Sequence, residues 1–129
     1  MTARIIAAVA VLVSAYVHLH LWIQYHSAHQ VVGVAWMVNA VAGVVIAVLL
    51  FTWQNWLAPL LAAAFGASTL IAFIISTTGS GLFGVHEKWV GSYVWAAFVS
   101  EVVAIAVGLY AVVVERRAAA APERARVHS

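Results

Sequence analysis

The sequence contains no cysteine and very little charge, with six basic and four acidic side chains in 129 residues. The absence of cysteine excludes disulfide bonds and thiolate metal sites. Charged residues make up 8% of the chain, whereas about 25% is usual for a soluble domain. A water-soluble fold could not cover its surface with so few charges. The composition therefore excludes a soluble enzyme, a nucleic-acid binder and a disordered chain.

The hydrophobic residues, 66% of the chain, gather in four long runs at 5–25, 34–51, 57–77 and 93–114. A helix needs about 20 mostly apolar residues to cross a bilayer, and its backbone groups must be hydrogen-bonded internally there. We predict an all-α, polytopic membrane protein with a four-helix transmembrane bundle over residues 1–114. A charged cytoplasmic tail follows over 115–129, which we expect to start as a frayed extension of the fourth helix and then to be disordered. No small-residue cleavage site follows the first run, so we expect an uncleaved span rather than a signal peptide.

The basic residues predict the orientation of the chain in the membrane. Arg4 precedes the first run, and the other arginines follow the fourth run, namely Arg116, Arg117, Arg124 and Arg126. The positive-inside rule then predicts that both termini are cytoplasmic, which agrees with an even number of spans. Tryptophan prefers the headgroup layer, and all six tryptophans lie near predicted span ends: Trp22, Trp36, Trp53, Trp56, Trp89 and Trp95.

Small residues recur at four-residue spacing along two of the runs. They are Ala35, Gly43 and Ala47 around Asn39, and Ala97, Ala104 and Gly108 around Glu101. Because lipid gives no hydrophobic drive between helices, close contact faces favour small side chains. These faces predict tight packing inside the bundle, with a self-association face between copies as the alternative.

Each predicted span carries a polar side chain at a similar depth in the outer leaflet. These side chains are His18, Asn39, Ser68 or Thr69, and Glu101. Glu101 lies about 12 Å, and His18 about 10 Å, inside the predicted outer ends of their helices. One interpretation is a buried hydrogen-bond network that fixes helix register. The other is a functional site in which Glu101 binds a proton or cation and His18 is its coupled partner.

Histidines cluster on the predicted outer side. His26 and His29 are three residues apart, and His86 and Glu87 lie in the other outer loop. Together they form a candidate site for Zn²⁺ or Cu²⁺, ions that accept imidazole and carboxylate ligands. The alternative is that these histidines lie at the headgroup level without binding metal. Haem with two axial histidines is disfavoured, because His18 and His20 point to different faces of one helix.

Short motifs connect the chain with a known group of proteins. The segment 18–22, His-Leu-His-Leu-Trp, ends the first run, and 81–84, Gly-Leu-Phe-Gly, precedes the fourth in an Ala/Val-rich body. In these features the chain resembles the small four-span integral membrane proteins of high-GC actinobacteria. The resemblance implies a location in the bacterial plasma membrane, and it transfers neither an activity nor catalytic residues.

The predicted partner is the lipid bilayer, with a larger membrane complex or a second copy of the chain as further candidates. Too little soluble surface exists for a catalytic domain, so we expect a non-enzymatic subunit or binding module with a site in the outer leaflet. One alternative is a small oligomeric transporter, or a proton or metal-ion conductor, that uses Glu101. Another is an anchor of an oxidoreductase that binds quinone or haem.

Overall fold

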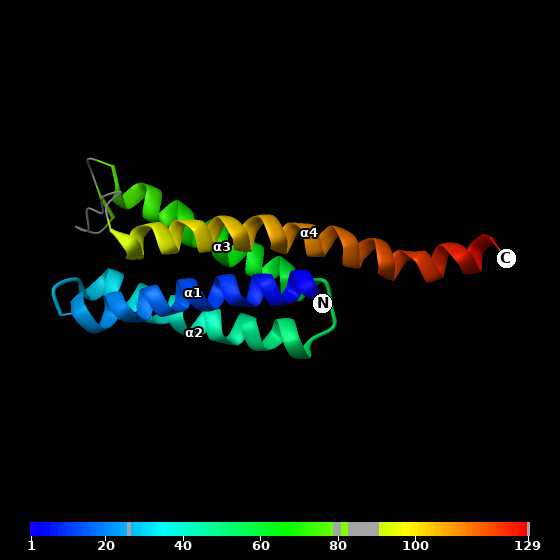
Figure 1. Cartoon of the computed structure of the whole chain (residues 1–129), viewed down its shortest axis with the longest axis horizontal. Coiled ribbons are helices and arrows are strands. Elements are labelled where there is room, and N and C mark those ends of the chain that lie inside the picture. Colours follow the sequence, from blue (N-terminus) through cyan, green and yellow to red (C-terminus); the bar gives the residue numbers. More distant parts are fainter. Residues whose placement is uncertain (26, 79–80, 83–90, 129) are drawn as a thin grey trace.

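The chain folds into four α-helices in the computed structural model, which describes residues 1–25, 27–78, 81–82 and 91–128, with side chains up to residue 121. The helices are α1 (Thr2–Tyr25), α2 (Gln30–Thr52), α3 (Leu57–Ser76) and α4 (Ser92–His128) (Figure 1). Each of them is long and apolar enough to cross a membrane. The predicted all-α class with four spans is thereby confirmed, and the apolar helices indicate a multi-pass membrane protein.

The helix ends differ from the predicted span ends in the polar residues beyond each apolar run. Helix α2 begins at Gln30, four residues before the predicted start, and α4 continues to His128 rather than ending near residue 114. Hydropathy locates the apolar centre of a helix but not its polar ends. Alanine, glutamate and arginine, which dominate 115–126, are strong helix formers. They extend α4 beyond its apolar part, where the sequence predicts a frayed extension of the helix before a disordered end.

The helices pack closely at one end of the bundle and separate toward the other. Helix α1 lies along both α2 and α4, and α3 lies along α4, whereas α2 and α3 share much less contact (Figure 1). A short turn at 53–56 joins α2 to α3, so these two helices are close there. The main hydrophobic core lies in this closed half and includes Ala7, Val11, Leu50 and Ala62.

Three glycines allow helix backbones to approach each other within this bundle. A Cβ atom at Gly43 of α2 would lie 2.7 Å from Ala15 Cβ of α1. At Gly66 of α3 it would lie 2.7 Å from the carbonyl oxygen of Glu101, and at Gly108 of α4 it would lie 2.8 Å from that of Pro59. The small-residue faces therefore pack inside the bundle, as the sequence predicts. Ala35 is the exception, because its side chain is exposed.

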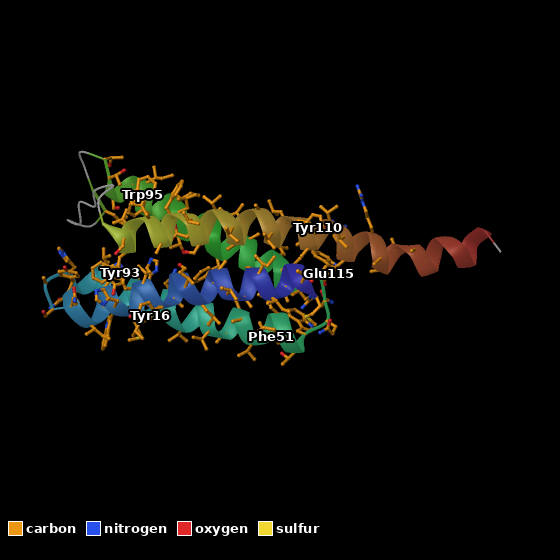
Figure 2. The ribbon with its side chains drawn as sticks, viewed as in Figure 1. Tyr16, Phe51, Tyr93, Trp95, Tyr110 and Glu115 are labelled. Carbon is orange, nitrogen blue, oxygen red and sulfur yellow. The ribbon has the colours of Figure 1, made fainter. Side chains whose placement is uncertain are left out.

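A buried arginine holds the closed end together. Arg4 is 3% exposed, and its Nη1 donates to the carbonyl oxygens of Leu50 (2.8 Å) and Trp53 (2.9 Å). Its Nη2 donates to the carbonyl oxygen of Asn55 (2.9 Å) and forms an ion pair with Glu115 Oε1 of α4 (2.6 Å). Figure 2 shows Glu115 at this end, beside the start of α1. The sequence singles out Arg4 only as an orientation marker, so its role as a link between α1, the α2–α3 turn and α4 is a new finding.

Candidate functional site

A cavity of about 350 Å³ lies in the open half of the bundle, and all four helices contribute to its wall. Its lining is mainly apolar and includes the aromatic side chains of Trp36, Phe65, Phe73 and Tyr93. Ligand pockets in proteins typically measure about 300–1,000 Å³ and combine apolar walls with a few polar groups. The cavity is therefore large enough for a small organic molecule.

The five polar residues predicted from shared depth all line this one cavity. They are His18 on α1, Asn39 on α2, Ser68 and Thr69 on α3, and Glu101 on α4. They come together because each helix turns its polar position toward the space that α2 and α3 leave between them. Their role in function stays a prediction.

Asn39 presents an unpaired carbonyl oxygen at the cavity. Thr69 donates its hydroxyl hydrogen to the carbonyl oxygen of Phe65 (2.8 Å), so its oxygen is free to accept from Asn39 Nδ2 (2.8 Å). The hydroxyl has only one hydrogen to give, which fixes the amide with Nδ2 toward Thr69. Asn39 Oδ1 is then left buried without a hydrogen-bond partner in the described part of the chain.

His18 is held by the preceding turn of its own helix. Its Nδ1 lies 2.7 Å from the carbonyl oxygen of Ser14. A carbonyl oxygen can only accept, so Nδ1 carries the hydrogen of the neutral ring and Nε2 carries the lone pair. The imidazole therefore offers the cavity a hydrogen-bond acceptor.

Glu101 is almost fully buried, with 1% of its surface exposed. Its Oε2 has no hydrogen-bond partner among the described residues. An ionised carboxylate without a companion cation is costly in such an environment, so the carboxyl group is neutral when no cation is beside it. No hydrogen bond joins Glu101 to His18 within the described ranges. The coupling of these two side chains that the sequence predicts is therefore not a direct hydrogen bond there.

The cavity opens on the lipid-facing surface between α2 and α3. Four of its lining residues are also exposed, namely Ala35 and Val38 of α2, Ser68 of α3 and Tyr93 at the start of α4. Above the polar groups, Leu82 lines the cavity and packs against Val32 and Trp36. A lipid-soluble molecule could reach the polar groups sideways from the bilayer.

An aromatic contact joins α1 to α4 beside the cavity. The rings of His20 and Tyr93 stack with their centroids 4.2 Å apart and their planes 4° from parallel. The side chain of Tyr93 also hydrogen-bonds to Tyr16, one helical turn before His20, and Figure 2 shows both tyrosines at the open end. Sequence reasoning missed Tyr93 and the aromatic walls, because large apolar side chains in a membrane span are equally typical of lipid contact.

The candidate metal site falls mostly outside the described residues, since His26, His86 and Glu87 are not described. His29 is described, and its ring meets the edge of Trp36 at a centroid distance of 6.1 Å. Among the described residues, no group of three histidine or acidic side chains could hold a metal ion. The Zn²⁺ or Cu²⁺ site therefore stays a prediction.

Comparison of the chain with protein-family models, curated proteins and solved structures finds no match. The site must therefore be interpreted from its own geometry and chemistry.

Proposed function

We propose that this protein is a non-enzymatic binding module that holds a small amphipathic molecule in the cavity between α2 and α3. One observation carries the proposal: Asn39 Oδ1 and Glu101 Oε2 are both buried on the wall of one largely apolar cavity, and neither has a hydrogen-bond partner among the residues that the structure describes. A buried polar group without a partner costs about 1–3 kcal/mol. A lipid acyl chain in the cavity would leave both atoms unpaired, whereas a molecule with a polar head can satisfy them.

The burial of Glu101 favours a site within one chain over a pore between copies. Its side chain is 1% exposed and faces the cavity of its own bundle. An ion path built by oligomerisation around Glu101 would need this carboxyl group at the outer surface of the bundle. Quinone, by contrast, belongs to the class of small amphipathic molecules that the cavity could take.

The cavity can be tested with a matched set of naphthalene probes that carry an aminomethyl, hydroxymethyl, carboxyl or methyl group. We expect at least one polar-headed probe to stabilise the protein in lipid nanodiscs against thermal unfolding, and to do so more than the methyl compound. Occupancy at 100 times Kd adds about 2.7 kcal/mol to stability.

Two variants of α3 give the control. Ala72 lines the cavity, and Ala64 is exposed on the same helix and does not line it. Ala72→Phe should fill the cavity and remove the stabilisation by the probe, whereas Ala64→Phe should keep it. If no probe distinguishes the two variants, the cavity is not a binding site.

The orientation of the bundle belongs to the same proposal, in which the protein lies in a bacterial plasma membrane with both termini cytoplasmic and the cavity in the outer leaflet. The basic residues at the two chain ends support it. Because the chain has no cysteine, a single introduced thiol reports its own side of the membrane. Ser27 and Thr2 are both exposed, at opposite ends of α1.

We expect Ser27→Cys to react with a membrane-impermeant maleimide on intact cells, and Thr2→Cys to react only after permeabilisation. Labelling in the reverse order would invert the proposed topology and would place the cavity in the inner leaflet.

A further inference from the structure

We propose that the molecule held in the cavity is a lipophilic amine, which enters as the uncharged base and is bound as an ammonium ion against Glu101. This inference rests on the proposed function and names its ligand class. It follows from the direction of the hydrogen bonds that the cavity can still make.

Two residues that line the cavity carry hydrogen-bond acceptors, and for one of these acceptors, Asn39 Oδ1, no donor is found among the described residues. Asn39 Oδ1 is an acceptor because Nδ2 already donates to Thr69, and His18 Nε2 is an acceptor because Nδ1 is bound to Ser14. A ligand that fits must therefore bring N–H or O–H groups. A carbonyl compound, an ether or an ester brings none and would leave both acceptors unpaired.

Glu101 supplies the proton that turns an amine into a donor. The neutral carboxyl group gives its hydrogen to the nitrogen lone pair of the amine, so that an N–H bond forms as an O–H bond breaks. The products are a carboxylate and an ammonium ion in contact, and no net charge enters the cavity. Such a pair satisfies Glu101 Oε2 and leaves further N–H groups of a primary or secondary ammonium for the acceptors.

The walls suit the same kind of ligand. Trp36, Phe65, Phe73 and Tyr93 line the cavity, and aromatic faces attract a desolvated cation while they also pack against apolar groups. The titratable side chains of the lining are His18 on α1 and Tyr93 and Glu101 on α4, while the described lining residues of α2 and α3 contribute none. The ion pair of Arg4 and Glu115 lies at the opposite, closed end, so Glu101 is the acidic group at the cavity among the residues that the structure describes.

Other cations fit less well. A divalent metal ion would keep a positive charge beside a single carboxylate, and a group of three metal ligands is absent from the described residues. A quaternary ammonium ion has no N–H group for the two acceptors and cannot be formed by the proton of Glu101. A hydroxyl compound donates one hydrogen but leaves the carboxyl group neutral.

The test compares three naphthylmethyl probes in titrations of the protein in nanodiscs, namely the N-methylamine, the alcohol and the trimethylammonium ion. We expect the wild type to bind the amine at least ten times more tightly than either of the other two. Glu101→Gln should weaken amine binding at least tenfold and change alcohol binding less than threefold. Ser100→Ala, at a neighbouring buried position outside the lining, should leave all three affinities unchanged.

Infrared difference spectra of the wild type test the proton transfer without a variant. Amine binding should remove the band of a protonated carboxyl group and add a carboxylate band, and alcohol binding should do neither. Amine binding without this change, or equal affinity for alcohol and amine, overturns the inference but leaves the binding module standing. If none of these three probes binds and no naphthalene probe of the thermal-unfolding test stabilises the protein, the proposed function falls with it.

Discussion

Arg4→Leu is expected to destabilise the protein by about 3–5 kcal/mol, because Arg4 is buried and each hydrogen bond to a charged group contributes about 1.5–3 kcal/mol. The substitution removes the hydrogen bonds to the carbonyl oxygens of Leu50, Trp53 and Asn55, as well as the ion pair with Glu115. Leu50 and Trp53 belong to the last turn and C-cap of α2, where the free carbonyl groups favour a positive charge. The carbonyl oxygens of Trp53 and Asn55 would each keep one backbone donor, the N–H of Asn55 (2.8 Å) and the N–H of Ala58 (3.1 Å) respectively.

Arg4→Lys should recover only part of this loss. Lysine keeps the charge, but its ammonium group cannot reproduce the planar fork by which the guanidinium group reaches α2, the turn and α4 at once. We therefore expect Arg4→Lys to lie between the wild type and Arg4→Leu. The free energy of unfolding of Arg4→Lys, relative to the wild type and Arg4→Leu, shows how much of the loss comes from the charge and how much from the geometry of the guanidinium group.

The matched control is Arg116→Leu. Arg116 is exposed at the same end of the bundle and lies over the ring of Trp56, 4.8 Å from its centroid. An exposed cation–π contact is worth about 0.5–1 kcal/mol, so this variant should lose far less stability than Arg4→Leu. Unfolding of each variant in mixed micelles with increasing denaturing detergent gives the comparison. Equal losses for Arg4→Leu and Arg116→Leu would show that Arg4 does not hold the closed end.

The case of Arg4 shows what hydropathy can and cannot predict. Four apolar runs of this length predict four helices, because a helix forms all of its backbone hydrogen bonds within one segment in lipid. The same hydropathy pattern cannot predict which residues far apart in the sequence contact each other. Arg4 and Glu115 are 111 residues apart, and only the packed bundle shows that they meet.

The polar layer could be predicted for a related reason, while the cavity could not. Asn39 and Glu101 each lie on a helix face that the sequence marks as inward, and the depth of these two residues and of His18 follows from residue counting. The cavity depends on how far α2 and α3 separate, which is a property of the packing and leaves no local signal. The tight glycine contacts on α2, α3 and α4 set that separation.

Gly66→Val tests this packing, and we expect it to destabilise the protein by about 1–3 kcal/mol, the usual cost of overpacking. A Cβ atom at Gly66 would lie 2.7 Å from the carbonyl oxygen of Glu101, 3.1 Å from Ile105 Cγ1 and 3.2 Å from Ala104 Cβ. The nearest of these is a backbone atom of α4, which cannot turn away as a side chain can. Helix α3 must therefore move off α4, and this movement shifts the wall of the cavity opposite Asn39.

Ala64→Val is the matched control, because Ala64 is exposed on the same helix and receives the same β-branched side chain. Helix propensity alone predicts that Gly66→Val stabilises the protein and Ala64→Val destabilises it. Valine is a better helix former than glycine by about 0.3 kcal/mol and a poorer one than alanine. A larger loss at Gly66 than at Ala64 in detergent unfolding would therefore come from the close approach of α3 to α4. If Gly66→Val is as stable as Ala64→Val and binds the naphthalene probes as the wild type does, then α3 is not held against α4 at this point. The position of the cavity wall would then need another cause.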